Sequence, residues 1–204
     1  MNEQRPIRAI IFDFGNVICF WKMDGLGESR EFALGLPKDT INNLVWEYLR
    51  AAGDGTYHSV QDYFERLKPV SPVGVDIVAE AYEEMEASAF IDHRMVDFIA
   101  ALKPRYKIAL LSNFPKGIED YLTARFRIGH LFDVVASSYN IGIRKPSLDA
   151  YRYASDQLGV TPEECLFVDD SEKNVLAAIE TGMKGIVYKN FEDFVVQFNQ
   201  VLGT

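Results

Sequence analysis

The sequence predicts an α/β protein built on a doubly wound, parallel β-sheet. Short apolar runs rich in Ile, Val and Leu recur along the chain, as is typical of strands that are buried on both faces. Segments whose apolar residues follow helical spacing separate most of these runs. Strands that alternate with helices favour a parallel sheet, and ligands of such sheets bind at the carboxyl ends of the strands.

The expected strands are short runs of predominantly apolar residues. They are Ala9–Phe12, Lys107–Leu111, Val134–Ala136, Leu166–Val168 and Gly185–Tyr188. Between them, the spacing predicts a helix over Arg94–Leu102 and another that follows Asp170 and ends at Gly182. A further helix is expected to open at Pro146, in the first turn where proline is tolerated, and to end at Gly159.

Residues 20–91 depart from this alternation, because they contain no clear strand and several helical runs. The helical runs are Glu28–Leu34, Thr40–Ala51, Val60–Leu67 and Val75–Ala87. We therefore predict a helical cap domain over residues 20–91, inserted after the first strand and standing over the strand ends. Residues 1–19 and 92–204 are expected to form the α/β core domain.

Composition excludes several classes of function. The 204 residues suffice for one core with a small accessory domain, and the net charge of −9 comes without a long basic run. No general nucleic-acid surface is therefore expected, and an anionic substrate must be held by local positive groups or a metal.

No apolar stretch is long enough to span a membrane and no signal peptide is recognisable, so we expect a cytoplasmic protein. Cys19 and Cys165 are too few for a disulfide scaffold and are expected as buried thiols.

Polar side chains stand where the expected strands end. Asp13 closes the first apolar run, and a hydroxyl, a lysine and a pair of acids follow at later strand ends. This combination indicates a site that handles phosphate. The segments are Asp13-Phe14-Gly15-Asn16-Val17, Ser112-Asn113, Lys145-Pro146 and Asp169-Asp170.

In order and spacing, these segments resemble the four motifs of the haloacid dehalogenase-like (HAD) hydrolase superfamily. The resemblance extends from about Ile7 to Lys189 and implies a Rossmann-like core with a cap. Three features are similar to small bacterial sugar-phosphate phosphatases of the glucose-1-phosphate type: the Phe12-Asp13-Phe14-Gly15-Asn16-Val17 segment, the Arg144-Lys145-Pro146 segment and the helical insert. They also resemble the phosphatase domain of soluble epoxide hydrolases.

The resemblance implies a nucleophile and a metal site. Asp13 would attack phosphorus and form an aspartyl-phosphate that water later hydrolyses. Asp13, the main-chain carbonyl of Gly15 and Asp170 would bind Mg²⁺ through oxygen atoms, and Asp169 would act through a water molecule. Adjacent aspartates repel each other without a cation, which also favours a metal.

The remaining motif residues would bind the phosphoryl group. Ser112 would donate its hydroxyl, and Asn113 and Phe114 their main-chain N–H groups. A helix expected to begin near Pro115 would direct its positive end to the same place. Lys145 would supply fixed positive charge to the phosphoryl group and to Asp13.

Gly15 departs from the superfamily pattern. Many phosphatases of the superfamily have a second aspartate two residues after the nucleophile, which serves as general acid and base, whereas the similar sugar-phosphate phosphatases carry glycine. Loss of a proton donor costs roughly 10²–10⁴ in rate unless the leaving group is good. A water molecule or a residue of the insert would have to substitute.

The insert carries further aromatic and acidic residues. The segment Trp21–Asp24 enters the insert and either lines the substrate pocket or forms an exposed hinge. Trp46 and Tyr48 are expected in the core of the insert, and Tyr82–Glu86 on a solvated helix face with one buried edge.

The sequence thus predicts a Mg²⁺-dependent phosphomonoester phosphatase, acting on a small metabolite such as a sugar phosphate. A haloacid dehalogenase is the nearest alternative, but those enzymes need no metal and lack the Asp169-Asp170 pair. A phosphomutase would depend on the acid–base residue that is missing at Gly15. A non-catalytic module that binds phosphate esters is the alternative from another class, and a small-molecule phosphate ester is the one partner expected.

Overall fold

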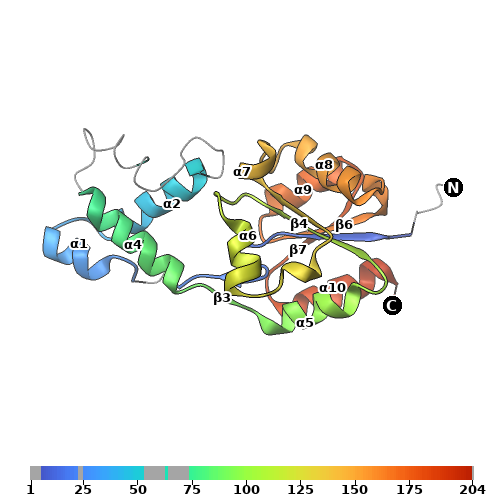
Figure 1. The fold of residues 1–204 in the computed structure, drawn as a ribbon, viewed down its shortest axis with the longest axis horizontal. Coiled ribbons are helices and arrows are strands. Elements are labelled where there is room, and N and C mark those ends of the chain that lie inside the picture. Colours follow the sequence, from blue (N-terminus) through green and yellow to red (C-terminus); the bar gives the residue numbers. More distant parts are fainter. Residues whose placement is uncertain (1–5, 23–24, 53–62, 64–73, 204) are drawn as a thin grey trace.

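The computed structural model describes residues 6–22, 25–52, 63 and 74–203. Its centre is a five-stranded parallel sheet with the strand order β5-β4-β1-β6-β7 (Figure 1). Each predicted strand is found with its ends shifted by no more than one residue, which confirms the α/β class. The strands are β1 (Ala9–Phe12), β4 (Lys107–Ser112), β5 (Val134–Ser137), β6 (Cys165–Asp169) and β7 (Lys184–Val187).

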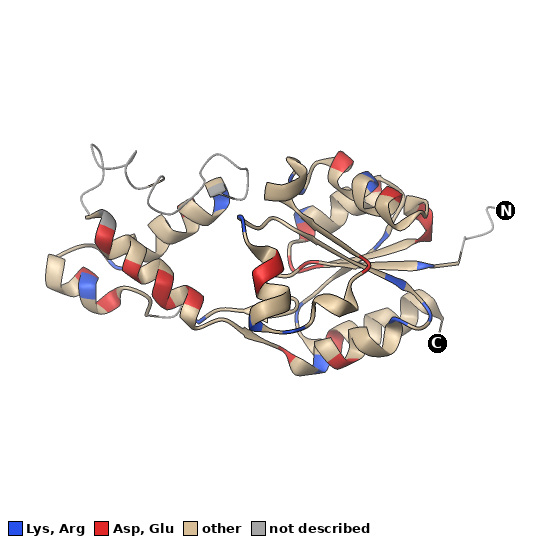
Figure 2. Cartoon of the chain, in the orientation of Figure 1, with Lys and Arg blue, Asp and Glu red and all other residues tan. Residues whose placement is uncertain are grey.

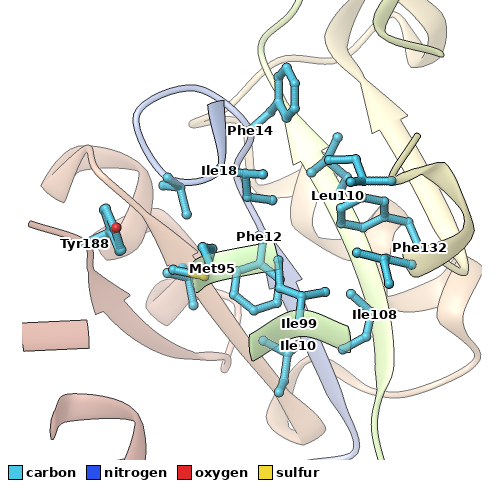
Figure 3. Packing of buried hydrophobic residues seen from close by; sticks show 14 of the residues in the cluster. Ile10, Phe12, Phe14, Ile18, Met95, Ile99, Ile108, Leu110, Phe132 and Tyr188 are labelled. Carbon is cyan, nitrogen blue, oxygen red and sulfur yellow. The ribbon is translucent and has the colours of Figure 1, made fainter. Parts of the chain in front are cut away.

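One face of the sheet packs against α5 (His93–Leu102) and α10 (Phe191–Leu202), the second of which the sequence analysis did not predict (Figure 1). Ile10 and Phe12 of β1 point to this face and meet Met95 of α5 (Figure 3). Burying one such side chain contributes about 1.5–3 kcal/mol, so this layer is a main source of stability.

The opposite face packs against α8 (Leu148–Leu158) and α9 (Glu172–Glu180). Ala9 and Ile11, which alternate with the residues of the first face, belong to this second cluster. Both faces of β1 are therefore covered, and its carboxyl end leads directly to Asp13.

Two helices begin later than predicted. Pro146 does not open α8, because residues 144–147 form a turn in which the Ser147 N–H donates to the Arg144 carbonyl (2.9 Å) and the Lys145-Pro146 bond is cis. The helix expected near Pro115 begins only at Ile118 and is a single short turn. The short helices are α6 (Ile118–Asp120), the π-helical η1 (Tyr121–Arg125), η2 (Gly129–Leu131), α7 (Ser138–Ile141) and η3 (Pro162–Glu164).

The cap lies beyond the carboxyl ends of the strands and contains α1 (Glu28–Leu34), α2 (Thr40–Ala52) and α4 (Val75–Ala87) (Figure 1). It has its own hydrophobic cluster, which includes Ile41 and Val78. The predicted helix Val60–Leu67 lies outside the described residues.

The expectation that residues 20–91 contain no strand is wrong at both ends of the segment. β2 (Cys19–Phe20) and β3 (Phe90–Ile91) pair antiparallel where the chain enters and leaves the cap, and the rings of Phe20 and Phe90 stack at 5.7 Å. Strands of two residues are too short for hydrophobic periodicity to reveal. Cys19 is buried, as is Cys165, and both thiols are free.

No helix within the described part of the chain is both long and apolar enough to cross a bilayer.

Gly185 sets the distance between β7 and α9. A Cβ atom at this position would lie 2.6 Å from Cγ1 of Val175 and 3.2 Å from the Ile179 side chain. Because overpacking of this kind costs about 1–3 kcal/mol, we expect Gly185→Ala to lower the free energy of unfolding by that amount in urea titrations. Val175→Ala supplies the control background, because it removes the Cγ1 atom that the new Cβ would meet, so Gly185→Ala should cost less there. Equal losses in the two backgrounds would contradict this account.

Candidate active site

Asp13 emerges from the centre of the sheet. Its N–H donates to the Val168 carbonyl (2.9 Å), which continues the pairing of β1 with β6 by one residue. The side chain is thereby placed at the carboxyl edge of the sheet, where it is almost fully buried. Its Oδ1 accepts a hydrogen bond from the Phe14 N–H (2.7 Å).

The Lys145 ammonium lies between two carboxylates. Its Nζ is 2.9 Å from Oδ1 of Asp13 and 2.5 Å from Oδ2 of Asp169. Lys145 is 2% exposed, so its charge has little access to solvent. A buried ammonium of this kind stays charged because the two carboxylates compensate it.

Asn113 holds the main chain of Lys145. The Asn113 Nδ2 donates to the Lys145 carbonyl (2.9 Å), and its Oδ1 accepts from the Lys145 N–H (2.8 Å). Asn113 directly follows Ser112, the last residue of β4. The side chain predicted near the phosphoryl group thus joins the end of β4 to the lysine loop, and this contact was not anticipated.

Asp169 is completely buried at the end of β6. Besides Lys145, it accepts hydrogen bonds from the Ser171 N–H (2.8 Å) and from Nδ2 of Asn174 (3.0 Å). Asn174 lies in the first turn of α9 and was missed in the sequence analysis. Its position in the sequence was the one signal that could have indicated this role: Asn174 is an amide in the first turn of the helix that follows Asp169 and Asp170.

Asp170 is more exposed and reaches the loop after β1. Its Oδ2 accepts from Nδ2 of Asn16 (3.0 Å), a second residue whose contact was missed. Asn16 has a φ of 56°, in the left-handed region that asparagine tolerates better than most residues. This conformation turns the chain back, so that the Cys19 N–H meets the Phe14 carbonyl (2.8 Å).

The structure brings the three predicted acids together. One carboxylate oxygen from each of Asp13, Asp169 and Asp170 lies within 4.8 Å of the others. An all-oxygen donor set of this kind fits a hard divalent cation such as Mg²⁺.

Burial and charge act against each other in this cluster. Burial raises the pKa of Asp13 to about 6, and Asp169 adds to the rise, whereas Lys145 opposes it. Burial by itself would lower the pKa of Lys145, but Asp13 and Asp169 raise it above its usual value. Burial also raises the pKa of Asp170. Because three carboxylates face one ammonium, the cluster has a negative excess that a cation would balance.

A cavity of about 200 Å³ opens above these residues, between the core and the cap. Ser112, which lies at the strand edge beside Asp13, is part of its lining. The core contributes Asp13, Gly15, Asn16, Trp21, Ser112, Asn113, Phe114, Pro115, Lys145, Asp170 and Asn174, and the cap contributes Trp46, Leu49, Met85 and Glu86. All predicted site residues except Asp169 line the cavity.

The structure corrects two expectations for the cap. Trp46 is 40% exposed and lines the cavity, whereas Tyr48 packs in the cap core as expected. Glu86 does not belong to a solvated face, because it is partly buried and also lines the cavity. Helical periodicity identifies the faces of a helix but not what each face meets.

Trp21 lines the same cavity, which decides between the two roles left open for it. Among the described residues, its indole Nε1 is one of the buried polar atoms without a hydrogen-bond partner. Met23 and Asp24 lie outside the described residues.

Comparison with curated proteins gives relatives over nearly the whole chain. The drimenol cyclase drtB of Aspergillus calidoustus is 26% identical over 205 aligned positions, which cover 97% of this chain but only 37% of that protein. The chain thus spans little more than a third of that relative. The sesquiterpene phosphatase astK of Aspergillus oryzae is 26% identical over 202 positions, covering 96% of this chain and 97% of that protein.

Solved structures share the fold. A HAD family enzyme from Bacteroides thetaiotaomicron, crystallised with magnesium and inorganic phosphate, superimposes with a TM-score of 0.72. The match covers 94% of this chain and 99% of that one, at 19% sequence identity. A match at this sequence identity shows a shared fold and nothing more. A family model described as haloacid dehalogenase-like hydrolase matches residues 7–182. Since that match spans most of the chain and includes all four motifs, the protein belongs to the haloacid dehalogenase-like hydrolases.

Proposed function

We propose that the protein is a Mg²⁺-dependent phosphomonoester phosphatase that works through an aspartyl-phosphate on Asp13. The observation that carries this proposal is the position of the Asp13 carboxylate. It lies at the base of a cavity, 2.9 Å from the Lys145 ammonium and close to the carboxylate of Asp170. The relative named as a phosphatase, which aligns over almost its full length, supports the same reaction class.

The first step transfers the phosphoryl group to the protein. Oδ1 of Asp13 is held by the Phe14 N–H and by Lys145, so we assign the attack to Oδ2. A bond forms between this oxygen and phosphorus as the ester P–O bond breaks, and the leaving oxygen takes a proton. The Ser112 hydroxyl and Lys145 stabilise charge on the phosphoryl oxygens.

In the second step, water attacks phosphorus and the bond to Asp13 breaks. Inorganic phosphate leaves, and Asp13 returns as a free carboxylate. Lys145 keeps its position through both steps, because Asn113 holds its main chain and Asp169 holds its ammonium group.

The metal would be held by Asp13, Asp170 and the main-chain carbonyl of Gly15, with Asp169 acting through a water molecule. The bound Mg²⁺ would reduce the repulsion between the Asp13 carboxylate and the anionic substrate. The hydrogen bonds that Asp169 accepts from Asn174 and Ser171 support a second task for it, which is to position Lys145.

The cavity favours a small substrate. Its volume of about 200 Å³ lies below the ~300–1,000 Å³ typical of pockets for drug-sized ligands. A sugar phosphate remains the prediction from sequence. The described cap residues Trp46, Leu49 and Met85 are apolar, however, and favour an ester with an apolar organic group, in line with the relative named as a sesquiterpene phosphatase. A phosphate-release screen should therefore include sugar phosphates and alkyl or prenyl phosphates.

Replacing the nucleophile should abolish turnover. We expect Asp13→Asn to lower kcat for 4-nitrophenyl phosphate by at least about a thousandfold, because a neutral amide is a poor nucleophile. Release of 4-nitrophenol is the measurement, and circular dichroism checks that the variant folds. Asp149→Asn, at an exposed position on α8, is the matched control. Retained activity in the Asp13 variant would exclude the covalent mechanism.

Removing the metal should stop the reaction reversibly. We expect EDTA to abolish phosphate release and added Mg²⁺ to restore it, because the acidic cluster repels an anionic substrate without a cation. Turnover of 2-haloacids that persists in EDTA would instead support a dehalogenase. Binding of beryllium fluoride without phosphate release from any ester of the screen would support a non-catalytic module.

A further inference from the structure

Glu86 is the carboxyl group that the cap contributes to the cavity. Among the described residues that line the cavity, the carboxyl groups are those of Asp13, Asp170 and Glu86. In the proposed function, Asp13 is the nucleophile and Asp170 a metal ligand. Glu86 is therefore the acid of the cavity lining to which that mechanism gives no task.

The loop after β1 supplies no proton donor at position 15, because Gly15 has no side chain. A Cβ atom built on Gly15 would lie 3.6 Å from Cζ3 of the Trp21 ring, in ordinary van der Waals contact. The Trp21 ring therefore borders position 15 without supplying a carboxyl group there. A proton donor for the leaving group must reach the cavity from another direction, and Glu86 enters it from the cap.

The core holds the Glu86 carboxyl group through Tyr121. The Tyr121 hydroxyl donates a hydrogen bond to Oε2 of Glu86. The Tyr121 ring packs against Phe14, which follows Asp13, and against Phe114, with centroid distances of 6.0 Å and 5.3 Å. Glu86 is therefore linked by two contacts to the loops that carry the nucleophile and the phosphate-binding residues.

The end of α4 is fastened to the core at the same place. The Arg125 Nη2 donates to the main-chain carbonyls of Ala87 (3.1 Å) and Ala89 (3.3 Å). Figure 2 shows acidic residues along α4, and the last of them is Glu86. The Arg125 contacts hold the end of α4 against the core, next to Glu86, which lines the cavity, whereas Glu83 of the same helix is exposed.

We propose that Glu86 is the acid–base residue of this site, a role that rests on the proposed phosphatase function. Its carboxylic acid would give a proton to the leaving oxygen as the ester P–O bond breaks. The resulting carboxylate would then take a proton from the water molecule that hydrolyses the aspartyl-phosphate on Asp13. One proton is donated and one is recovered, so the cycle returns Glu86 to its acid form.

The surroundings of Glu86 suit both protonation states. Burial raises its pKa to about 7, while a hydrogen bond from Tyr82 and the charge of Arg125 act in the opposite direction. The other ionisable groups that face it are the hydroxyls of Tyr121 and Tyr48. Cys19 also faces it, with a thiol pKa that burial raises to about 12. A group that titrates near neutral pH can serve as acid in one step and as base in the next.

The first test compares leaving groups. We expect Glu86→Gln to lower kcat/KM by roughly 10²–10⁴ for n-butyl phosphate, whose alkoxide needs a proton, and by less than about tenfold for 4-nitrophenyl phosphate, whose leaving group does not. Glu83→Gln is the matched control and should leave both values unchanged. Equal losses on the two esters would overturn the proposal in favour of a structural role, and no loss on n-butyl phosphate would overturn it outright.

The second test uses pH. The wild-type kcat/KM for n-butyl phosphate should fall as the pH rises through about 7, because Glu86 loses the proton that it donates. Glu86→Gln should remove this fall, which is the alkaline limb of the pH profile. Tyr82→Phe should move it to higher pH, since the lost hydrogen bond favoured the carboxylate form. A pH dependence that persists in Glu86→Gln would refute the assignment.

Wild-type protein that releases phosphate from neither ester would instead overturn the phosphatase proposal, and the role of Glu86 with it.

Discussion

The buried ion pairs of Lys145 are the interaction on which the rest of the site depends. An ammonium that is 2% exposed needs compensating charge, because removing an unpaired ion from water costs several kcal/mol. Asp13 and Asp169 provide that charge from the ends of β1 and β6. Asn113, which follows β4, holds the lysine main chain. Lys145 thus links three neighbouring strands, through its side chain to β1 and β6 and through its main chain to the end of β4.

The same arrangement prepares the site for an anion and a cation. Three carboxylates and one ammonium leave a negative excess, which favours a divalent cation of the kind that oxygen ligands bind. In the proposed mechanism, Lys145 and the Ser112 hydroxyl would then stabilise the phosphoryl oxygens. The hydrogen bonds that Asn174 and Asn16 donate to Asp169 and Asp170 orient these two carboxylates.

Polar contacts join the cap to the core, and the cap has its own hydrophobic cluster. Tyr121 and Arg125 hold the end of α4, and the Arg144 Nη1 donates to the Arg50 carbonyl (3.2 Å) at the end of α2. Arg144 directly precedes Lys145, so the lysine loop contacts the cap as well as the sheet. Among the described lining residues, the core supplies Asp13, Lys145 and Asp170, and the cap supplies Glu86 together with the apolar Trp46, Leu49 and Met85.

The sequence by itself determined the layout of the core and the identity of the motif residues. Buried parallel strands need continuous apolar runs, and their carboxyl ends must meet at one edge, so Asp13, Ser112 and Asp169 were predictable at that edge. Only the tertiary structure decided which groups hold them. The roles of Asn113, Asn174 and Tyr121 arise from contacts between segments far apart in the chain, and a single polar residue on a helix gives no sign of its distant partner. Glu86 shows this best: periodicity placed it on a helix face, but only the docking of the cap on the core turned that face toward the cavity.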